Sequence, residues 1–145
     1  STELDIIMGA AAPYLEEVRE QAEHLPFKTT VSVNVTDMAK RMCLADLSIG
    51  AAGGASWERC SLGLPAVLVV LAENQVAGAT ALEAFGAATK LDEADELGTT
   101  LPFVMRALSE SSRLERMSEA AAGITDGNGV FRTIQAMSAA CRRGL

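Results

Sequence analysis

Residues 50–75 read GAAGGASWERCSLGLPAVLVVLAENQ, and this stretch decides the fold class. The run of small residues at its start predicts a tight turn, and the helical segment that follows, over residues 56–63, ends at Gly63. After Pro65, the apolar run over residues 66–71 has the length and composition of a strand that is buried on both faces. A turn, a helix and a buried strand in this order predict a βαβ unit with a parallel sheet.

The same alternation extends to both sides of this stretch. We expect strands at residues 4–8, 28–33, 45–49 and 87–91 in addition to 66–71. We expect helices at residues 14–24, 38–44, 101–109, 112–123 and 130–141, and one that follows residues 73–75 and ends at Phe85. This order predicts an α/β fold, a Rossmann-like three-layer α/β/α domain with a parallel sheet, formed as one domain by residues 1–145.

The composition indicates a folded chain and excludes several partners. Hydrophobic residues make up 49% of the 145 residues, but only 4% are aromatic, so the core must be aliphatic. The net charge of -7 argues against nucleic acid or an anionic membrane as a partner. No apolar run approaches the roughly 20 residues that span a bilayer, so we expect no stable membrane insertion. We interpret Cys43, Cys60 and Cys141 as small buried hydrophobic residues in a cytoplasmic protein.

Four segments follow the expected strands and point to a binding site. They are residues 9–13, 34–37, 50–58 and 72–75, and they are the segments richest in small and polar residues. Ligands of open parallel sheets bind outside the carboxyl ends of the strands. These segments therefore define the candidate site.

The small-residue turn has the chemistry of a phosphate-binding loop. Small side chains let a ligand approach the backbone, and the following helix offers N–H groups and a positive dipole end. The dinucleotide pattern G-x-G-x-x-G and the Walker sequence G-K-S/T are both absent, which disfavours an NAD-type dehydrogenase. Such a turn serves packing as often as ligand binding. Ser56 suits either a helix N-cap or a phosphate ligand.

For three further residues of these segments and beside them, two interpretations remain open. Glu58 either compensates the helix dipole on a solvated face or accepts hydrogen bonds from ribose hydroxyls. Arg59 either neutralises a phosphate or points to solvent. Asn74 either caps the following helix or reaches a ligand.

We expect neither a metal ion nor a cofactor. Glu93, Asp95 and Glu96 form an acidic cluster without an accompanying histidine, which is typical of a solvated surface. The only histidine, His24, comes late in the first helix and far from the carboxyl ends of the strands, so we interpret it as an exposed or capping residue.

Residues 50–75 resemble the UDP-sugar hydrolases of pseudaminic acid biosynthesis, which share the GT-B architecture with relatives in spore-coat polysaccharide biosynthesis. The shared pattern is a glycine-rich loop, then SWERC, GLP, a hydrophobic strand and an NQ pair. Residues 13–17, 34–38 and 45–47 agree with it. More distantly, the stretch is similar to the C-terminal half of the lipid-linked muramyl glycosyltransferase that uses UDP-GlcNAc.

This resemblance implies a site for a UDP-sugar. Glu58 would bind the ribose hydroxyls, and the backbone of residues 53–56 would contact the diphosphate. Val35 would read the uracil edge through its main chain, while Met38 packs on the base. The implied substrate-binding residues are Gly9, Ala10, Val35, Met38, Gly53, Gly54, Ala55, Ser56, Glu58, Asn74 and Gln75.

The catalytic residues implied by the family are missing. These hydrolases carry a catalytic histidine in a G-H-x-x-R-type loop of an N-terminal domain, and no such motif occurs here. We therefore expect the C-terminal half of a two-domain GT-B protein, with the N-terminal domain of the same protein as its partner. The main prediction is the UDP-binding domain of a UDP-sugar hydrolase. The alternatives are a glycosyltransferase half-domain and a non-catalytic nucleotide-sugar-binding module.

Overall fold

The computed structural model describes residues 2–92, 97–109 and 112–142. The chain divides into two compact units, Ser1–Met38 and Ala39–Leu145, and each is described by itself. The acidic cluster at Glu93, Asp95 and Glu96 lies outside the described residues.

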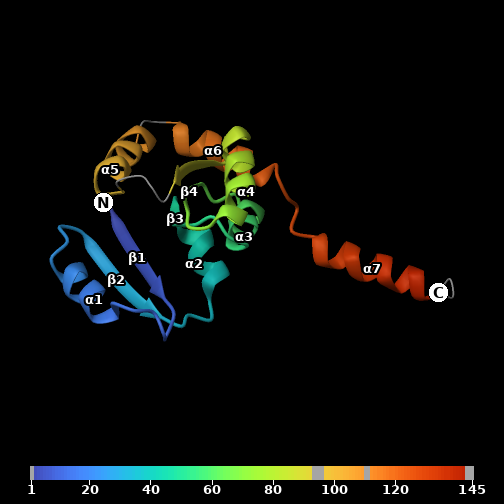
Figure 1. The fold of residues 1–145 in the computed structure, drawn as a ribbon, viewed down its shortest axis with the longest axis horizontal. Coiled ribbons are helices and arrows are strands. Elements are labelled where there is room, and N and C mark those ends of the chain that lie inside the picture. Colours follow the sequence, from blue (N-terminus) through green and yellow to red (C-terminus); the bar gives the residue numbers. More distant parts are fainter. Residues whose placement is uncertain (1, 93–96, 110–111, 143–145) are drawn as a thin grey trace. The chain divides into compact units, whose positions relative to one another are not determined.

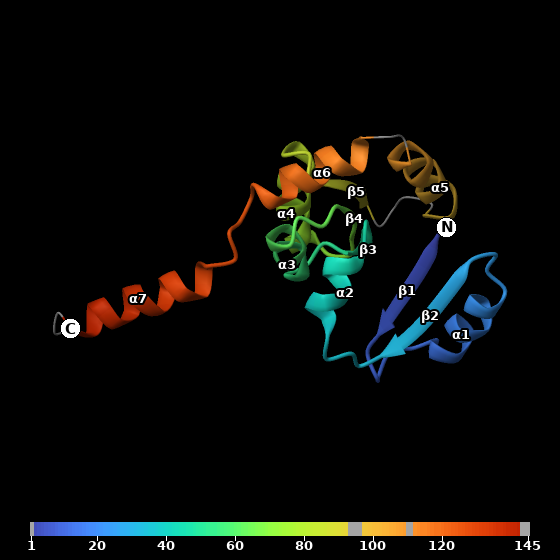
Figure 2. The same ribbon diagram turned by 180° about the vertical axis from the view of Figure 1, so that it is seen from behind.

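The first unit is a parallel β-α-β motif. Strand β1 (Glu3–Met8) pairs with strand β2 (Lys28–Val33) in a register that runs from Glu3 opposite Lys28 to Met8 opposite Val33. Helix α1 (Leu15–Glu23) connects the strands, which lie side by side in Figure 2. In both strands the first four residues alternate between exposed and half-buried, and the last two residues are also half-buried.

The second unit is built around a parallel sheet with the strand order β3-β4-β5. Its elements, coloured from cyan to red in Figure 1, are α2 (Met38–Leu44), β3 (Ser48–Ala51), α3 (Ala55–Ser61), β4 (Ala66–Val70), α4 (Glu73–Ala84), β5 (Ala88–Asp92), α5 (Leu97–Leu108), α6 (Arg113–Ala122) and α7 (Gly129–Arg142). Together, the parallel pairing and the alternation of helices with strands confirm the Rossmann-like α/β fold.

Strand β4 is the centre of the core because both of its faces are covered. Ala66, Leu68 and Val70 belong to one cluster of buried residues, which includes Leu82 of α4. Val67 points to the opposite face and belongs to a second cluster. The other buried members of that cluster are Leu91, Leu108 and Met117. The continuous apolar run predicted a strand with two buried faces, and the structure confirms this.

The turn between α3 and β4 shows why a glycine ends the helix there. Gly63 has φ +64°, a conformation that costs other residues energy. Its N–H donates to the Cys60 carbonyl at 3.0 Å, and the Leu64 N–H donates to the Arg59 carbonyl at 2.9 Å. This is the Schellman pattern of helix termination. Ser118 Oγ of α6 donates to the Gly63 carbonyl at 2.7 Å and holds the turn against that helix.

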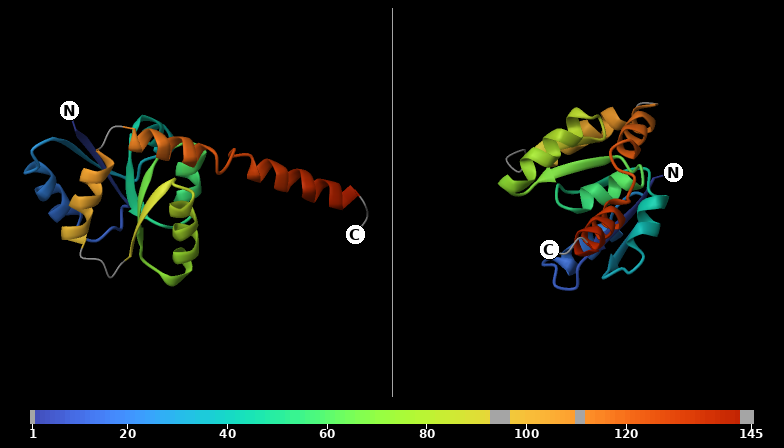
Figure 3. Two further views of the ribbon diagram at one scale, coloured as in Figure 1. Left: turned by 90° about the horizontal axis from the view of Figure 1, so that it is seen from above. Right: turned by 90° about the vertical axis from the view of Figure 1, so that its right-hand side faces the viewer.

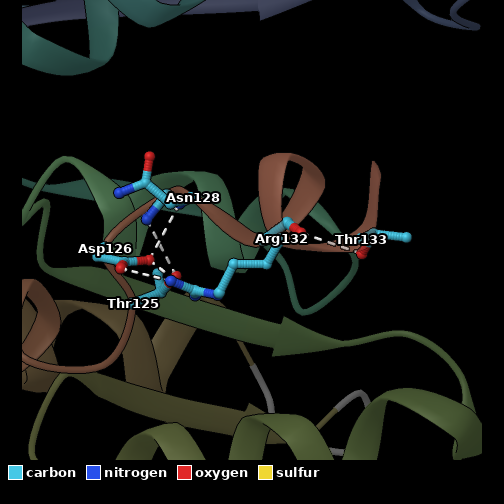
Figure 4. A network of polar contacts seen from close by, with 7 residues as sticks. Thr125, Asp126, Asn128, Arg132 and Thr133 are labelled. Carbon is cyan, nitrogen blue, oxygen red and sulfur yellow. Dashed lines mark hydrogen bonds and ion pairs between the residues drawn. The ribbon is translucent and has the colours of Figure 1, made fainter. Parts of the chain in front are cut away.

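Helix α7 begins at a group of polar contacts between Asp126, Asn128 and Arg132, the polar staple, which Figure 4 shows. Both Asp126 carboxylate oxygens accept from Arg132, at 2.7 and 2.9 Å, and Oδ1 also accepts from the Asn128 N–H at 3.0 Å. These contacts hold the pKa of the Asp126 carboxyl well below its ordinary range, with the Arg132 hydrogen bonds as the main cause. Figure 3 shows α7 as one continuous helix, and it contains no buried residue.

Several sequence-based predictions were wrong in detail. The third strand is at Ser48–Ala51 and not at residues 45–49, because its pairing begins where the Ser48 N–H donates to the Pro65 carbonyl at 2.9 Å. Helix α5 starts four residues earlier than residue 101, so Pro102 lies inside it. Cys60 is buried as expected, and burial raises the pKa of its thiol, but Cys43 and Cys141 are exposed. The strands form two sheets, β1-β2 and β3-β4-β5, within the described residues.

Candidate functional site

The turn between β3 and α3 presents three backbone N–H groups. In the part of the chain that the structure describes, the N–H groups of Gly53, Gly54 and Ala55 have no hydrogen-bond partner. The neighbouring groups are already used: the Ala52 N–H donates to the Val69 carbonyl, and the Ser56 N–H donates to the Gly53 carbonyl, both at 3.0 Å. Consecutive free N–H groups at a helix start are suited to bind an anion. Of the backbone groups expected to contact a diphosphate, the Ser56 N–H is thus already engaged.

Gln75 joins the next strand end to this turn. Its Oε1 accepts from the Leu71 N–H at 3.0 Å, which fixes the side chain over the end of β4. Its Nε2 lies 3.9 Å from the position that a Cβ on Gly53 would occupy. A side-chain amide donor therefore lies beside the N–H groups of the turn.

Asn74 is not the cap of α4. The helix begins at Glu73 with Ala72 at the N-cap position, and no side chain makes a capping hydrogen bond there. Asn74 thus lies inside the first turn and is exposed. The capping interpretation is wrong because the helix starts two residues earlier than that interpretation required.

The first turn of α3 carries Ser56, Trp57 and Glu58 in three different environments. Ser56 is buried, and its Oγ has no hydrogen-bond partner among the described residues. The N-cap is Gly54, so the interpretation of Ser56 as a capping residue is wrong. Trp57 is 50% exposed, although a lone tryptophan is by default expected to pack in the core. Glu58 is exposed, one helical turn beyond the glycines.

Arg59 turns inward and not to solvent. It is only 9% exposed, and its Nη1 donates to the Ala51 carbonyl at 3.2 Å. Its Nε is buried without a partner among the described residues. Burial lowers the pKa of the guanidinium, and the adjacent Glu58 opposes that shift. The group stays protonated at any physiological pH.

Hydrogen bonds connect the segments that follow β1 and β2 in the first unit. The Ala10 N–H donates to Asn34 Oδ1 at 2.8 Å, and the Asn34 N–H donates to the Met8 carbonyl at 3.0 Å. Asn34 has φ +51°, a left-handed conformation that asparagine tolerates better than most residues. Gly9 and Ala10 are exposed, while Val35 and Met38 are half-buried.

A shallow hollow elsewhere in the second unit does not coincide with these residues. Its lining includes Glu83, Thr89, Arg113 and Arg116, at the start of β5. Ligands of parallel sheets bind at the carboxyl ends of strands, and this hollow lies at an amino end. We therefore place the candidate site at the turn between β3 and α3.

Within the described residues, no group of three or more His, Cys, Asp or Glu side chains is arranged to hold a metal ion. His24 is exposed, as expected, and is the C-cap residue of α1, with its Nδ1 2.6 Å from the Glu20 carbonyl oxygen. Among the same residues, no helix has the length and apolar character that crossing a membrane requires.

Comparison with known sequences shows the domain family of this chain. Residues 2–130 match the family described as the glycosyltransferase family 28 C-terminal domain. The spore coat polysaccharide biosynthesis protein SpsG of Bacillus subtilis is 33% identical over 130 residues, which are 87% of this chain and 38% of that protein. The UDP-N-acetylglucosamine–N-acetylmuramyl-(pentapeptide) pyrophosphoryl-undecaprenol N-acetylglucosamine transferase of Salinibacter ruber is 31% identical over 124 residues, which are 82% of this chain and 33% of that protein.

Solved structures agree on the fold. The MurG protein of Acinetobacter baumannii superposes with a TM-score of 0.79 at 24% identity, over 95% of this chain and 42% of that one. A glycosyltransferase of kitacinnamycin gives 0.65 at 18% identity, over 95% of this chain and 43% of that one. The chain thus spans well under half the length of the proteins it matches.

Proposed function

Because the chain belongs to the family of glycosyltransferase family 28 C-terminal domains, we propose that it binds the UDP half of a nucleotide sugar for a GT-B glycosyltransferase. The observation that carries the proposal is the turn at Gly53, Gly54 and Ala55, whose N–H groups have no partner among the described residues. Gln75 stands beside this turn, and the carboxylate of Glu58 is exposed one helical turn away. Anion donors next to an acceptor for hydroxyl groups suit a diphosphate that is linked to a ribose.

In this proposal the diphosphate lies on the three N–H groups and Glu58 accepts from the ribose hydroxyls. Asn74, which is exposed, and Gln75 would reach the sugar or the adjacent phosphate. For residues of the first unit, the family resemblance alone implies contacts: the main chain of Val35 with uracil, Met38 with the base, and Gly9 and Ala10 with the phosphates. Ser56 would add its hydroxyl, which is buried without a partner among the described residues.

The transferase is favoured over the hydrolase by the named relatives. One relative transfers N-acetylglucosamine and the other acts in polysaccharide biosynthesis, and neither is named as a hydrolase. The hydrolase interpretation rests on the SWERC and NQ resemblance alone. Either reaction would need groups from the remainder of a longer protein, a soluble cytoplasmic GT-B enzyme with an N-terminal domain as the partner of this chain.

Calorimetry with UDP, UMP and uridine tests the proposal. We expect UDP to bind more tightly than UMP because the turn offers donors to a second phosphate. Glu58→Ala should weaken UDP binding by about tenfold or more, the range for a hydrogen bond to a charged group. The matched control is Glu115→Ala, which removes an exposed carboxylate from the first turn of α6.

A deoxy ligand separates the ribose role from a general loss of charge. If Glu58 binds ribose hydroxyls, 2′-deoxy-UDP should bind more weakly than UDP to the unmodified chain, and Glu58→Ala should shrink that difference. An unchanged UDP affinity in Glu58→Ala would refute the ribose assignment. Failure of the unmodified chain to bind any uridine nucleotide would refute the nucleotide site itself.

A further inference from the structure

The candidate site has a shortage of positive charge. At the turn between β3 and α3 and at the strand end beside it, residues 50–58 and 72–75 contain no lysine, arginine or histidine, but they do contain Glu58 and Glu73. The whole chain carries a net charge of -7. Backbone N–H groups supply only partial charges, so a doubly or triply charged diphosphate at this turn needs a cation from beside the site.

Arg59 is the residue that follows the turn segment directly, and its guanidinium lies against the turn. Nη1 donates to the Ala51 carbonyl at 3.2 Å. Nη2 is 2.8 Å from the position that a Cβ on Gly50 would occupy, a distance that real Cβ atoms do not tolerate. Gly50 therefore leaves the space in which the end of the Arg59 side chain lies.

This guanidinium has no carboxylate partner among the described residues, unlike two arginines on the surface. Arg19 pairs with Glu16, and Arg132 pairs with Asp126, each at 2.7 Å. Arg59 is the more buried group, yet within the described residues it hydrogen-bonds to a carbonyl alone, and its Nε has no partner there. A buried charge without a counter-ion is costly to the fold, and its field is weakly screened by solvent. The fold thus retains against the turn a positive charge that no ion pair among the described residues neutralises.

Resting on the proposed function, we propose that Arg59 is the positioning residue of the diphosphate subsite. It holds the Ala51 carbonyl, which keeps the turn in shape, and it supplies the counter-charge that the turn lacks. In this role Arg59 sets the preference of the site for UDP over uridine. Its position depends on the absence of a side chain at Gly50.

A purely structural arginine would behave differently. If Arg59 only fastened α3 to the turn, its loss would weaken binding of charged and uncharged ligands alike. If its charge acts on the diphosphate, its loss lowers the affinity for UDP and spares that for uridine. The ratio of UDP affinity to uridine affinity is therefore the readout.

The test is titration calorimetry of UDP and uridine with the 145-residue chain and its variants. For Arg59→Met we expect about tenfold weaker UDP binding, about 1.4 kcal/mol, and less than about a twofold change for uridine. Arg59→Lys retains the charge on a different head group and should therefore keep more of the ratio of UDP to uridine affinity than Arg59→Met does. The salt dependence of UDP binding should be shallower in Arg59→Met than in the unmodified chain.

Gly50→Ala tests the position of the charge without removing it. The new Cβ would meet the end of a flexible side chain, so the fold should persist while the guanidinium is displaced from the turn. We expect a several-fold loss of UDP affinity that is absent when Gly50→Ala is added to Arg59→Met. The control Gly78→Ala, in α4 with no atom near the added Cβ, should leave both affinities unchanged.

The outcomes separate this inference from the proposed function. An unchanged ratio of UDP to uridine affinity in Arg59→Met overturns the role of Arg59 and leaves the nucleotide site intact. A parallel loss of both ligands in Arg59→Met and Arg59→Lys shows a structural role and also overturns it. If Arg59→Met does not fold, the ratio of UDP to uridine affinity is compared in Arg59→Lys and Gly50→Ala. A ratio that is retained in Arg59→Lys and lowered in Gly50→Ala supports the inference. Any other pair of results overturns it. Failure of the unmodified chain to bind either ligand overturns both proposals.

Discussion

The two units of the chain differ in how they bury their residues. Among the described residues, every buried side chain lies between Ala52 and Ala121, in the second unit. The first unit has none, although its strands pair over six residues each. A segment of this size has too little interior to form a core by itself, whereas β4 is covered on both faces.

Because of this difference, we expect the predicted contact residues of the two units to differ in how firmly they are held in position. The turn at Gly53–Ala55, together with Arg59 and Gln75, belongs to the unit with the core, where packing holds positions firmly. Gly9, Ala10 and Val35 belong to the unit without buried residues, where local opening needs less free energy. We expect the turn at Gly53–Ala55 to be rigid and the strand ends of the first unit to be less ordered.

The largest expected effect comes from truncating the same residue type in each unit. Leu68→Ala removes a side chain that is 0% exposed in the centre of β4 and should lower the free energy of unfolding by about 3 kcal/mol. Leu4→Ala, at a half-buried position in β1, should cost about 1 kcal/mol. Urea denaturation followed by the fluorescence of Trp57 and by circular dichroism measures both. Equal losses in the two variants would contradict the contrast between the units.

The same contrast explains which features the sequence predicted. The buried strand and the C-terminal glycine of α3 were predicted because both depend on local rules: a continuous apolar run, and a positive φ that glycine accepts. The start of β3 was misplaced because residues 45–49 have the composition of a strand, while the actual bounds depend on where pairing with β4 begins. That pairing involves the Pro65 carbonyl, which no local pattern reveals.

The position of the candidate site remains a prediction, and the environments of its side chains could not be predicted from the sequence. The turn and Gln75 follow from the rule about carboxyl ends of parallel strands. The inward turn of Arg59 depends on the space beside Gly50, which is a tertiary feature. The spacing of Gly50 and Arg59 alone carries no signal for it. The free N–H groups of the turn likewise became apparent only when the hydrogen bonds of its neighbours were known.

A smaller effect should follow from removing the hydrogen bond from the Ala10 N–H to Asn34 Oδ1, which connects the strand ends of the first unit. Asn34→Gly keeps the left-handed backbone but removes the acceptor of the Ala10 N–H, which should cost about 1 kcal/mol. Asn34→Ala should cost roughly 1 kcal/mol more, because alanine disfavours a positive φ. Amide hydrogen exchange should show faster exchange at Ala10 in both variants and little change in β4. Unchanged protection at Ala10 would show that this hydrogen bond does not order this unit.

The smallest expected effect concerns α7, which lacks buried residues as the first unit does. The folded-state pKa of Asp126 lies below its ordinary value, so the ion pair with Arg132 stabilises the start of α7 at any pH above about 4. That contribution is lost as the pH falls through the folded-state pKa. In Arg132→Gln the carboxyl should titrate nearer its ordinary value, as followed by NMR of the Asp126 carboxyl carbon. Arg19→Gln, which breaks a surface pair in α1, should leave the titration of Asp126 unchanged. If Asp126 titrates at the same pH in the unmodified chain and in Arg132→Gln, the staple does not form in solution. In that case the ion pair does not stabilise the start of α7, and the difference in stability between α7 and the core around β4 is larger than the structure indicates.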